Sequence, residues 1–210
     1  MKILKRVVSG WVMLVLICSL PGLSLMVDYE DDFEGTELSK KWIILNGKWR
    51  IIDGALSSTR ISTKGTAVGY SKIYFNQELV APYTLEVEVK GQYLAICFHI
   101  QEDQFRNSYW FYYNAYGANP INGNHHIFLE ESQDPSQGFY SHISYFAKEC
   151  DSNEFYKIRI DVQQGQHSVW INEKKIGKVK HADFSQGRIG FQACGANIPI
   201  FIDNFKVTKK

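Results

Sequence analysis

The sequence contains little cysteine, which limits the ways in which the chain can be held together. It has four cysteines in 210 residues, and Cys18 lies within the first 26. The other three, Cys97, Cys150 and Cys194, include no CxxC pair, and their spacing matches no zinc pattern. They are compatible with buried thiols or with one disulfide and one thiol. The 184 residues that follow the first 26 bury enough apolar surface to fold without a disulfide framework.

An excess of positive charge is also missing, and this excludes one class of partner. The formal net charge is +1, and three of the 23 basic residues lie close to the N-terminus. Residues 27–210 then carry 20 basic and 22 acidic side chains, a net charge of −2. Nucleic-acid-binding proteins carry a basic patch or stripe, so we do not expect nucleic acid as a partner.

Internal repeats, low-complexity runs and linkers are absent as well, so we expect a single folded domain over residues 27–210. Aromatic residues, in contrast, make up 14% of the chain, which suits strands better than helices. Alternating or apolar runs are interrupted by turn residues about every ten positions. This pattern predicts an all-β protein, a two-sheet antiparallel jelly-roll sandwich with little helix.

The first 26 residues have the three parts of a signal peptide. Basic residues form a positive start, Val7 to Leu20 form an apolar stretch, and Pro21 to Ser24 form a helix-breaking end with small residues. The same segment would serve as an uncleaved membrane anchor if a span tolerated its proline. Both interpretations place the domain outside the cytoplasm. We therefore expect a secreted or cell-envelope protein that meets a membrane only through an uncleaved N-terminal segment.

Strict alternation of apolar and other residues sets the faces of several strands. Thr84 to Lys90 and Leu94 to Ile100 both alternate, as half-buried strands do. In the second run, alternation turns Ile100 inward and His99 to the opposite face. Elsewhere in the chain, Asp53-Gly54 predicts a hairpin turn. We expect the following side chains to be buried between the sheets: Leu85, Val87, Ile96, Phe98, Ile158, Ile160, Ile189 and Phe191.

The order of these segments resembles that of bacterial concanavalin-A-like and laminin-G-like domains. The resemblance covers about residues 31–207 and rests on Asp31-Asp32-Phe33, Gly47 to Leu56, Tyr83 to Lys90, Ala95 to His99, Asn107 to Tyr112, Gly187 to Phe191 and Phe201 to Val207. It implies the fold but no single function, because lectins, carbohydrate-binding modules, hydrolases and adhesion domains all use this fold. Similar sequences are often named as family-sixteen glycoside hydrolases or three-keto-disaccharide hydrolases.

A carboxylate pair is missing where the resemblance to glycosidases would place it. Family-sixteen enzymes carry Glu-x-Asp-x-x-Glu on one strand of the concave sheet, and the corresponding strand, Ser108 to Asn114, contains no acid. Glu86 and Glu88 share one strand face, for which a solvated outer surface is the ordinary interpretation. Glycosidases of this mechanism need two facing carboxylates, so we predict no catalytic residue. Other chemistry on sugars stays open.

Aromatic and polar side chains converge on one face of the predicted concave sheet. Trp110 and Tyr112 share a strand face, and alternation turns His99 and His126 to the same side. Each of these residues has an alternative role in packing, but their convergence is typical of a groove that stacks and hydrogen-bonds a sugar. We expect a ligand site formed by His99, Arg106, Asn107, Trp110, Tyr112 and His126.

Carboxylates near both ends of the domain raise the question of a metal. Asp31, Asp32 and Asp203 would lie close together if the first and last strands pair, as they do in this fold. Oxygen ligands of this kind suit a structural calcium ion. The alternative is that these side chains cap turns and accept hydrogen bonds from backbone amides.

These observations predict an exported, lectin-like domain that binds a glycan or polysaccharide without catalysis. A hydrolase acting on glycans is the first alternative, and a structural or adhesion domain without a small ligand is the second. An aromatic strip without facing acids favours binding over hydrolysis.

Overall fold

The computed structural model describes residues 29–58, 70–101, 105, 107–113, 124–134, 137–147, 150–194 and 199–210, with the backbone alone for 124–134 and 137–147. Within these residues the chain forms fifteen β-strands and no helix, in two antiparallel sheets. The predicted all-β sandwich is therefore confirmed. No helix in this part of the chain has the length and apolar character needed to cross a membrane. The predicted signal peptide, residues 1–26, and Arg106 lie outside the described residues.

Sheet A has eight strands, which run in the order β13 (Lys174–Lys180), β12 (Gln166–Ile171), β11 (Tyr156–Gln163), β6 (Tyr83–Lys90), β15 (Ile200–Lys209), β4 (Ala55–Ser58) and β3 (Arg50–Ile52), with β1 (Tyr29–Asp31) also paired to β15. Sheet B has seven strands, which run in the order β10 (Gln137–Ala147), β9 (Asn124–Asp134), β8 (Ser108–Tyr113), β7 (Leu94–Ile100), β14 (Gln186–Ala193), β5 (Ser71–Val80) and β2 (Trp42–Asn46).

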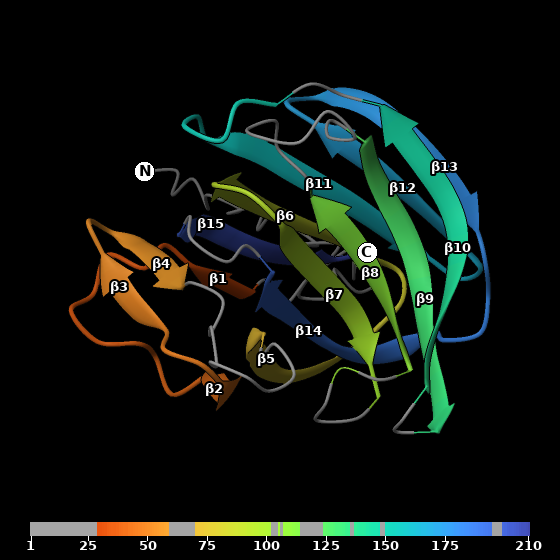
Figure 1. The fold of residues 1–210 in the computed structure, drawn as a ribbon, viewed down its shortest axis with the longest axis horizontal. Coiled ribbons are helices and arrows are strands. Elements are labelled where there is room, and N and C mark those ends of the chain that lie inside the picture. Colours follow the sequence, from red (N-terminus) through yellow and green to blue (C-terminus); the bar gives the residue numbers. More distant parts are fainter. Residues whose placement is uncertain are drawn as a thin grey trace, which may run out of the picture.

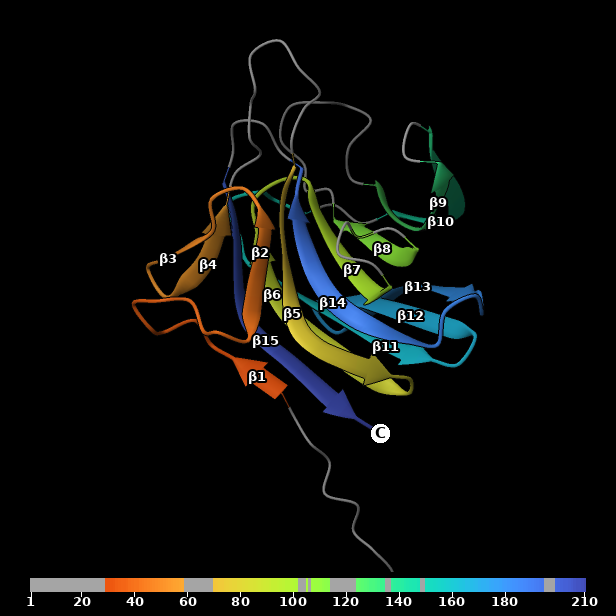
Figure 2. The ribbon, with the colours of Figure 1, turned by 90° about the horizontal axis from the view of Figure 1, so that it is seen from below.

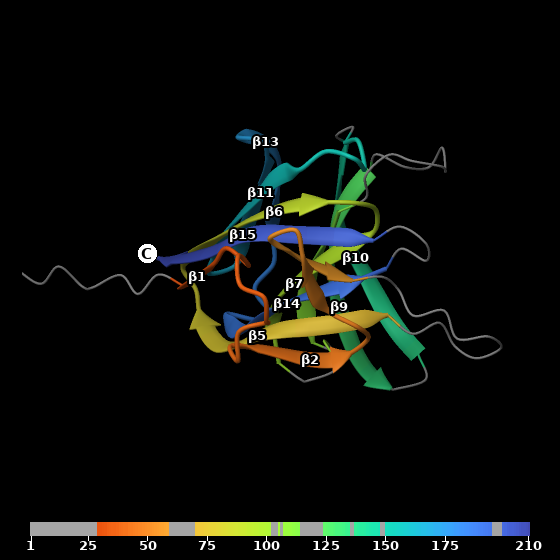
Figure 3. The same cartoon turned by 90° about the vertical axis from the view of Figure 1, so that its left-hand side faces the viewer.

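The two sheets lie face to face. Strands β7, β8 and β9 of sheet B lie over β6, β11 and β12 of sheet A (Figure 1). The end strands β10 and β13 come together at one side of the sandwich (Figure 1). The first strand, β1, pairs antiparallel with the last, β15, as Figures 2 and 3 show. This pairing of the chain's first and last strands was expected from the sequence.

The core between the sheets consists of the side chains that alternation predicts. All eight predicted core residues are buried, each with 1% or less of its surface exposed. Trp42 lies at one end of this core, and ring centroids 5.0–5.7 Å away surround it, those of Phe33, Phe75, Phe191 and Phe205. Burial of so many large apolar side chains is the main driving force for this fold.

The β3–β4 hairpin turns where the sequence predicts. Asp53 and Gly54 both have positive φ, 51° and 75°, and their strands pair from Ile52 with Ala55 onward. A two-residue turn in which both central residues have positive φ matches the right-handed twist of the flanking strands. Asp-Gly adopts this conformation readily.

The largest departure from the predicted pattern is a bulge in β7. Ile100 pairs with Arg188 and Cys97 with Gly190, so three residue steps of β7 face two of β14. His99, inside the bulge, has a φ of 55° and turns its ring inward. Ile100 therefore faces outward and packs in a cluster on the other side of sheet B. The predicted faces of His99 and Ile100 are both wrong, because one extra residue reverses the alternation.

Candidate functional site

The outer face of sheet B carries a second apolar cluster, separate from the core between the sheets. Its buried members come from three strands and two loops and are Tyr74, Ala95, Cys97, Ile100, Phe105, Trp110 and Cys194. Tyr93 and Tyr112 pack against it and are half-buried. The strand pairing explains the composition, because residues directly opposite one another on neighbouring strands share a face. One such row is Tyr74, Gly190, Cys97, Trp110 and Phe128.

Trp110 lies on the predicted face but is not the exposed platform that the sequence suggested. Only 3% of its surface is exposed, and its indole N–H donates to the Ser108 hydroxyl at 2.7 Å. The ammonium group of Lys72 lies 5.9 Å from the centre of its ring. Phe105, fully buried, belongs to the same cluster. Trp110 therefore packs within this cluster and does not line an open groove that stacks a sugar, as the sequence had predicted.

Tyr112 belongs to a neighbouring row that is more open and more polar. The row consists of Lys72, Gln192, Ala95, Tyr112 and His126. Burial raises the pKa of Tyr112 above its ordinary range, and Cys194, Tyr70 and Tyr93 near its hydroxyl raise it further. The Tyr93 ring lies 6.4 Å from the Tyr112 ring. We call Tyr70, Tyr93, Tyr112, Gln192 and Cys194 the Tyr112 cluster.

Gln192 contributes an unsatisfied acceptor to this cluster. Its amide nitrogen donates to the Cys194 sulfur at 3.3 Å, while its Oε1 atom accepts no hydrogen bond within the described structure. Only 3% of the residue is exposed, and an acceptor so deeply buried is costly to leave unpaired. Ala95, the register neighbour of Gln192 on β7, is fully buried in the outer cluster. The Oε1 atom of Gln192 is therefore an acceptor that a hydroxyl donor would satisfy.

The other predicted ligand residues fall in different places. Asn107 is half-buried in the turn before β8, with a φ of 52°. His126 stands opposite Tyr112 in the register, at the predicted position in the sheet, and only its backbone is described. His99 leaves the group altogether, because the bulge in β7 turns its ring into the interior.

Sequence reasoning missed Gln192 and Lys72 because it did not establish which strands flank β7. Strand β14 lies between β7 and β5, and this order brings residues about a hundred positions apart into one row. A signal was available within β14 itself. Ile189 and Phe191 were predicted to be buried, so Gln192 had to face outward on the side of Trp110.

His99 instead joins a group of rings inside the sandwich. Its ring lies 5.7 Å from Tyr83 and 6.0 Å from His167, measured between centroids. Burial lowers the pKa of His99 to about 4, although a hydrogen bond to the Phe184 carbonyl opposes the shift. Burial also lowers the pKa of His167 to about 3, and His99 and His181 lower it further. Both imidazoles are neutral near pH 7.

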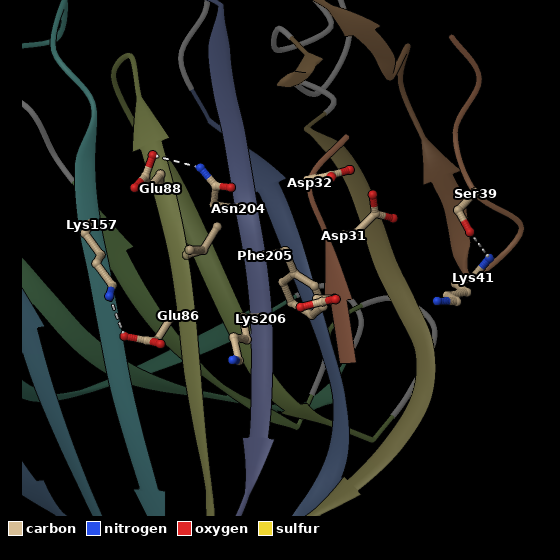
Figure 4. Close-up of a pocket in the computed structure, with 12 residues that line it drawn as sticks. Asp31, Asp32, Ser39, Lys41, Glu86, Glu88, Lys157, Asn204, Phe205 and Lys206 are labelled. Atoms are coloured by element: carbon tan, nitrogen blue, oxygen red, sulfur yellow. Dashed lines mark hydrogen bonds and ion pairs between the residues drawn. The ribbon is translucent and has the colours of Figure 1, made fainter. Parts of the chain in front are cut away.

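The outer face of sheet A has a polar groove of about 720 Å³ over β6, β11 and β15 (Figure 4). It contains Glu86 and Glu88, the two carboxylates that share a strand face. Glu86 forms an ion pair with Lys157 at 2.8 Å, and Glu88 accepts a hydrogen bond from Asn204 at 3.1 Å (Figure 4). Both carboxylates stand side by side on one strand and are engaged with neighbours. The same groove is also lined by Glu30 and Asp31 from β1 and by Asp32, the residue after it.

The three carboxylates considered for calcium are engaged with groups of the protein. Asp31 accepts hydrogen bonds from the Phe33 amide at 3.0 Å and from the Trp42 indole at 2.8 Å. Asp32 and Asp203 accept from the amides of Glu34 and Asn204. Among the residues that the structure describes, no group of three or more His, Cys, Asp or Glu side chains is arranged to hold a metal ion. These contacts correspond to the alternative interpretation, in which the carboxylates cap turns.

The three remaining cysteines, Cys97, Cys150 and Cys194, are buried thiols in the structure. Cys150 lies in the core between the sheets, whereas Cys97 and Cys194 belong to the outer cluster. This arrangement corresponds to the interpretation of these residues as small buried side chains.

Two packed antiparallel sheets with paired terminal strands define a jelly-roll β-sandwich of the concanavalin-A-like type. The chain belongs to the 3-keto-alpha-glucoside-1,2-lyase-like domain family, whose model matches residues 28–208. No curated protein sequence matches the chain.

Solved structures with the same fold share little sequence with this chain. The carbohydrate binding module CBM66 of Bacillus subtilis is 16% identical, with a TM-score of 0.63 over 79% of this chain and 94% of that one. A Bacillus subtilis protein of unknown function with a galectin-like fold is 11% identical, with a TM-score of 0.66 over 86% and 94%. β-Agarase B of Zobellia galactanivorans is 13% identical, with a TM-score of 0.63 over 88% and 93%. At these identities the likeness establishes the fold alone.

Proposed function

We propose that this protein is an exported glycan-binding domain that holds its ligand without catalysis at the Tyr112 cluster on the outer face of sheet B. The observation that carries the proposal is the buried Oε1 atom of Gln192, which has no hydrogen-bond donor within the described structure. A sugar hydroxyl is a suitable donor, and the half-buried rings of Tyr93 and Tyr112 offer apolar surface on the same outer face of sheet B. The family and the carbohydrate-binding structural neighbour support a glycan as the ligand.

Binding is favoured over catalysis by the chemistry of the two rows that cross sheet B. The rows through Tyr112 and Trp110 contain no carboxylate, so neither supplies the acid and base pair of a glycosidase. His99, the imidazole expected beside Trp110, faces the interior instead.

An enzyme that acts on glycans is the second candidate, and membership of the lyase-like family favours it. A lyase acting beside a keto group needs a base to remove a proton from carbon. Screening the protein against 3-keto glucosides and intact polysaccharides would identify such an activity through product release. Turnover that exceeds the rate without protein would replace the binding proposal with this one.

The binding proposal is tested with a glycan array followed by affinity measurements on the Gln192→Leu variant. Leucine has a similar size and removes the amide acceptor. We expect binding to weaken by about 2- to 10-fold, the range for one net hydrogen bond, with the fold retained. Gln163→Leu, on β11 of the other sheet, is the matched control and should bind like the unaltered protein. Equal affinity for Q192L and the unaltered protein would place the site elsewhere, and absence of any glycan ligand would favour an adhesion domain.

Export rests on the signal-peptide pattern of the first 26 residues. Expressing the full chain and sequencing the N-terminus of the extracytoplasmic protein tests this part of the proposal. A start after about residue 24 or 26 supports secretion. Retention of Met1 in the membrane fraction would indicate an anchor, and retention in the cytosol would contradict export.

A further inference from the structure

The interior of the sandwich contains a group of ionisable rings that the proposed glycan site does not use. His99 on β7, His167 on β12 and Tyr83 on β6 are each fully buried. Tyr109 on β8 lies between them, with its ring 4.5 Å from that of His167. These four residues come from both sheets, so the group joins one sheet to the other.

Several polar atoms in this group have no partner within the described structure. They are the Tyr83 hydroxyl, Nε2 of His99 and both ring nitrogens of His167. His99 Nδ1 donates to the Phe184 carbonyl at 2.9 Å, so in the neutral ring Nε2 carries no proton. Among the side chains that the structure describes, a proton added at Nε2 of His99, or to His167, would find no hydrogen-bond acceptor.

The backbone conformation at His99, which directs the imidazole ring into the interior, is unusual. His99 has a φ of 55°, which is uncommon for a residue other than glycine. Its partner strand accommodates the bulge with Gly187, whose φ is 144°. Strained positions of this kind persist only where the surrounding structure holds them, and they gather at functional and switching sites. The bulge turns an imidazole inward at a point where regular pairing would turn it outward.

The same rings hold the connection between β13 and β14, residues 181–185, which links the two sheets. His99 Nδ1 binds the Phe184 carbonyl, and the Phe184 amide donates to the Tyr109 hydroxyl at 3.4 Å. The Tyr109 hydroxyl also hydrogen-bonds to Nδ1 of His181 at 3.1 Å. His181 is partly exposed, and its Nε2 lies 3.6 Å from Asp183. This chain of contacts leads from the surface to the buried histidines.

We propose that His99 and His167 form a proton-operated latch, which holds the β13–β14 connection against the sheets while both imidazoles are neutral and releases it when they are protonated. Two positive charges with ring centroids 6.0 Å apart would repel each other in a medium that screens charge poorly. The proposal does not depend on the glycan site.

The groups that face the pair explain why protonation is unfavourable in the folded state. From β6 comes the Tyr83 hydroxyl, from β7 Phe98, from β8 Tyr109, and from the connection Phe184 and His181. None of these is a carboxylate. Asp183 pairs with the outer nitrogen of His181, on the side away from the Tyr109 hydroxyl.

The direction of the pH dependence follows from these shifts. In the folded protein burial lowers the pKa of His99 to about 4 and that of His167 to about 3, while both are near 6.5 in the unfolded chain. The unfolded state therefore binds more protons below pH 6.5. Stability from the neutral pair is complete above that value and is lost as the pH falls toward 4. As the pH falls through this window, each histidine raises the unfolding constant by about tenfold per pH unit.

The test compares the full chain with its His167→Phe variant, because phenylalanine keeps an aromatic ring and cannot be protonated. Unfolding constants are measured by denaturant titration between pH 7.5 and 4. We expect the ratio of the two constants to change by about tenfold per pH unit below pH 6. His99→Asn, which tolerates the positive φ, should give a similar change. Tyr83→Phe is the control, since it removes a hydroxyl from the same group and should keep the slope of the unaltered protein.

A second measurement separates a latch from uniform acid unfolding. Hydrogen exchange is compared at pH 7 and pH 5, corrected for the intrinsic rates, for the amides of residues 181–185 and for those of β11. We expect exchange to accelerate more in the connection than in β11, where only the fall in global stability acts. Equal acceleration in β11, or a pH slope for H167F parallel to that of the unaltered protein, would overturn the proposal. Should neither histidine variant fold, NMR titration of the unaltered protein decides, because imidazoles titrating near pH 6.5 would contradict the latch.

Discussion

Gly187 lies against the backbone of His99 so closely that a Cβ atom on the glycine would come within 2.5 Å of the His99 carbonyl carbon. Gly187 also has a φ of 144°, a conformation that other residues rarely adopt. We therefore expect Gly187→Ala to destabilise the protein by about 1–3 kcal/mol, because either the bulge or the β7–β14 pairing must shift. Denaturant unfolding at pH 7.5 measures this change. Gly35→Ala is the control, because the nearest atom to its added Cβ is 3.4 Å away, and it should cost less than about 0.5 kcal/mol.

Trp110 supports the outer cluster of sheet B, and its truncation should affect stability first. The side chain is 3% exposed and packs in one cluster with Phe105 and Ile100. We expect Trp110→Ala to lower the free energy of unfolding by about 3–5 kcal/mol. Trp170→Ala, on the outer face of sheet A, is the control. Its ring is half-buried between Arg159 and Lys175, and its loss should cost about 1 kcal/mol. A small loss for W110A would return Trp110 to the role of an open sugar platform.

Strand phases were predictable wherever alternation continued without interruption. Leu85, Val87, Ile158 and Ile160 come from β6 and β11, whose pairing has no register shift, and all four are buried as expected. A strand with one buried face must keep its register, because a slip of one residue would expose every apolar side chain. This constraint makes a regular strand readable from its sequence.

The site was less predictable, for two physical reasons. Phe98-His99-Ile100 reads as regular alternation, so the sequence does not reveal the bulge that turns both Phe98 and His99 inward. The exposure of Trp110 depends on Phe105 and on the non-local neighbours that complete the outer cluster, such as Tyr74 from β5. Pairing between distant strands decides such contacts, and local patterns carry no information about it.

The confirmed core residues give a direct test of the fold. Phe98 and Ile160 are fully buried between the sheets. We expect truncation of either one to Ala to cost about 2–5 kcal/mol, through lost burial and the cavity that remains. Ile44→Ala, where 43% of the side chain is exposed, should cost less than about 1 kcal/mol in the same denaturant assay. A loss for F98A no larger than that for I44A would contradict the described packing.

Asp31 joins the first strand to the core through its two carboxylate oxygens. One accepts from the Phe33 amide and the other from the indole of the buried Trp42, at 3.0 and 2.8 Å. We expect Asp31→Ala to cost about 1–3 kcal/mol, because the indole N–H would lose its acceptor inside the protein. Asp32→Ala removes an exposed carboxylate with a single 3.3 Å contact and should cost less than about 0.5 kcal/mol. Because these oxygens already serve donors of the protein, calcium or a chelator should leave the melting temperature unchanged. A calcium-dependent rise in melting temperature that is lost in both D31A and D32A would instead support the metal site that the sequence suggested.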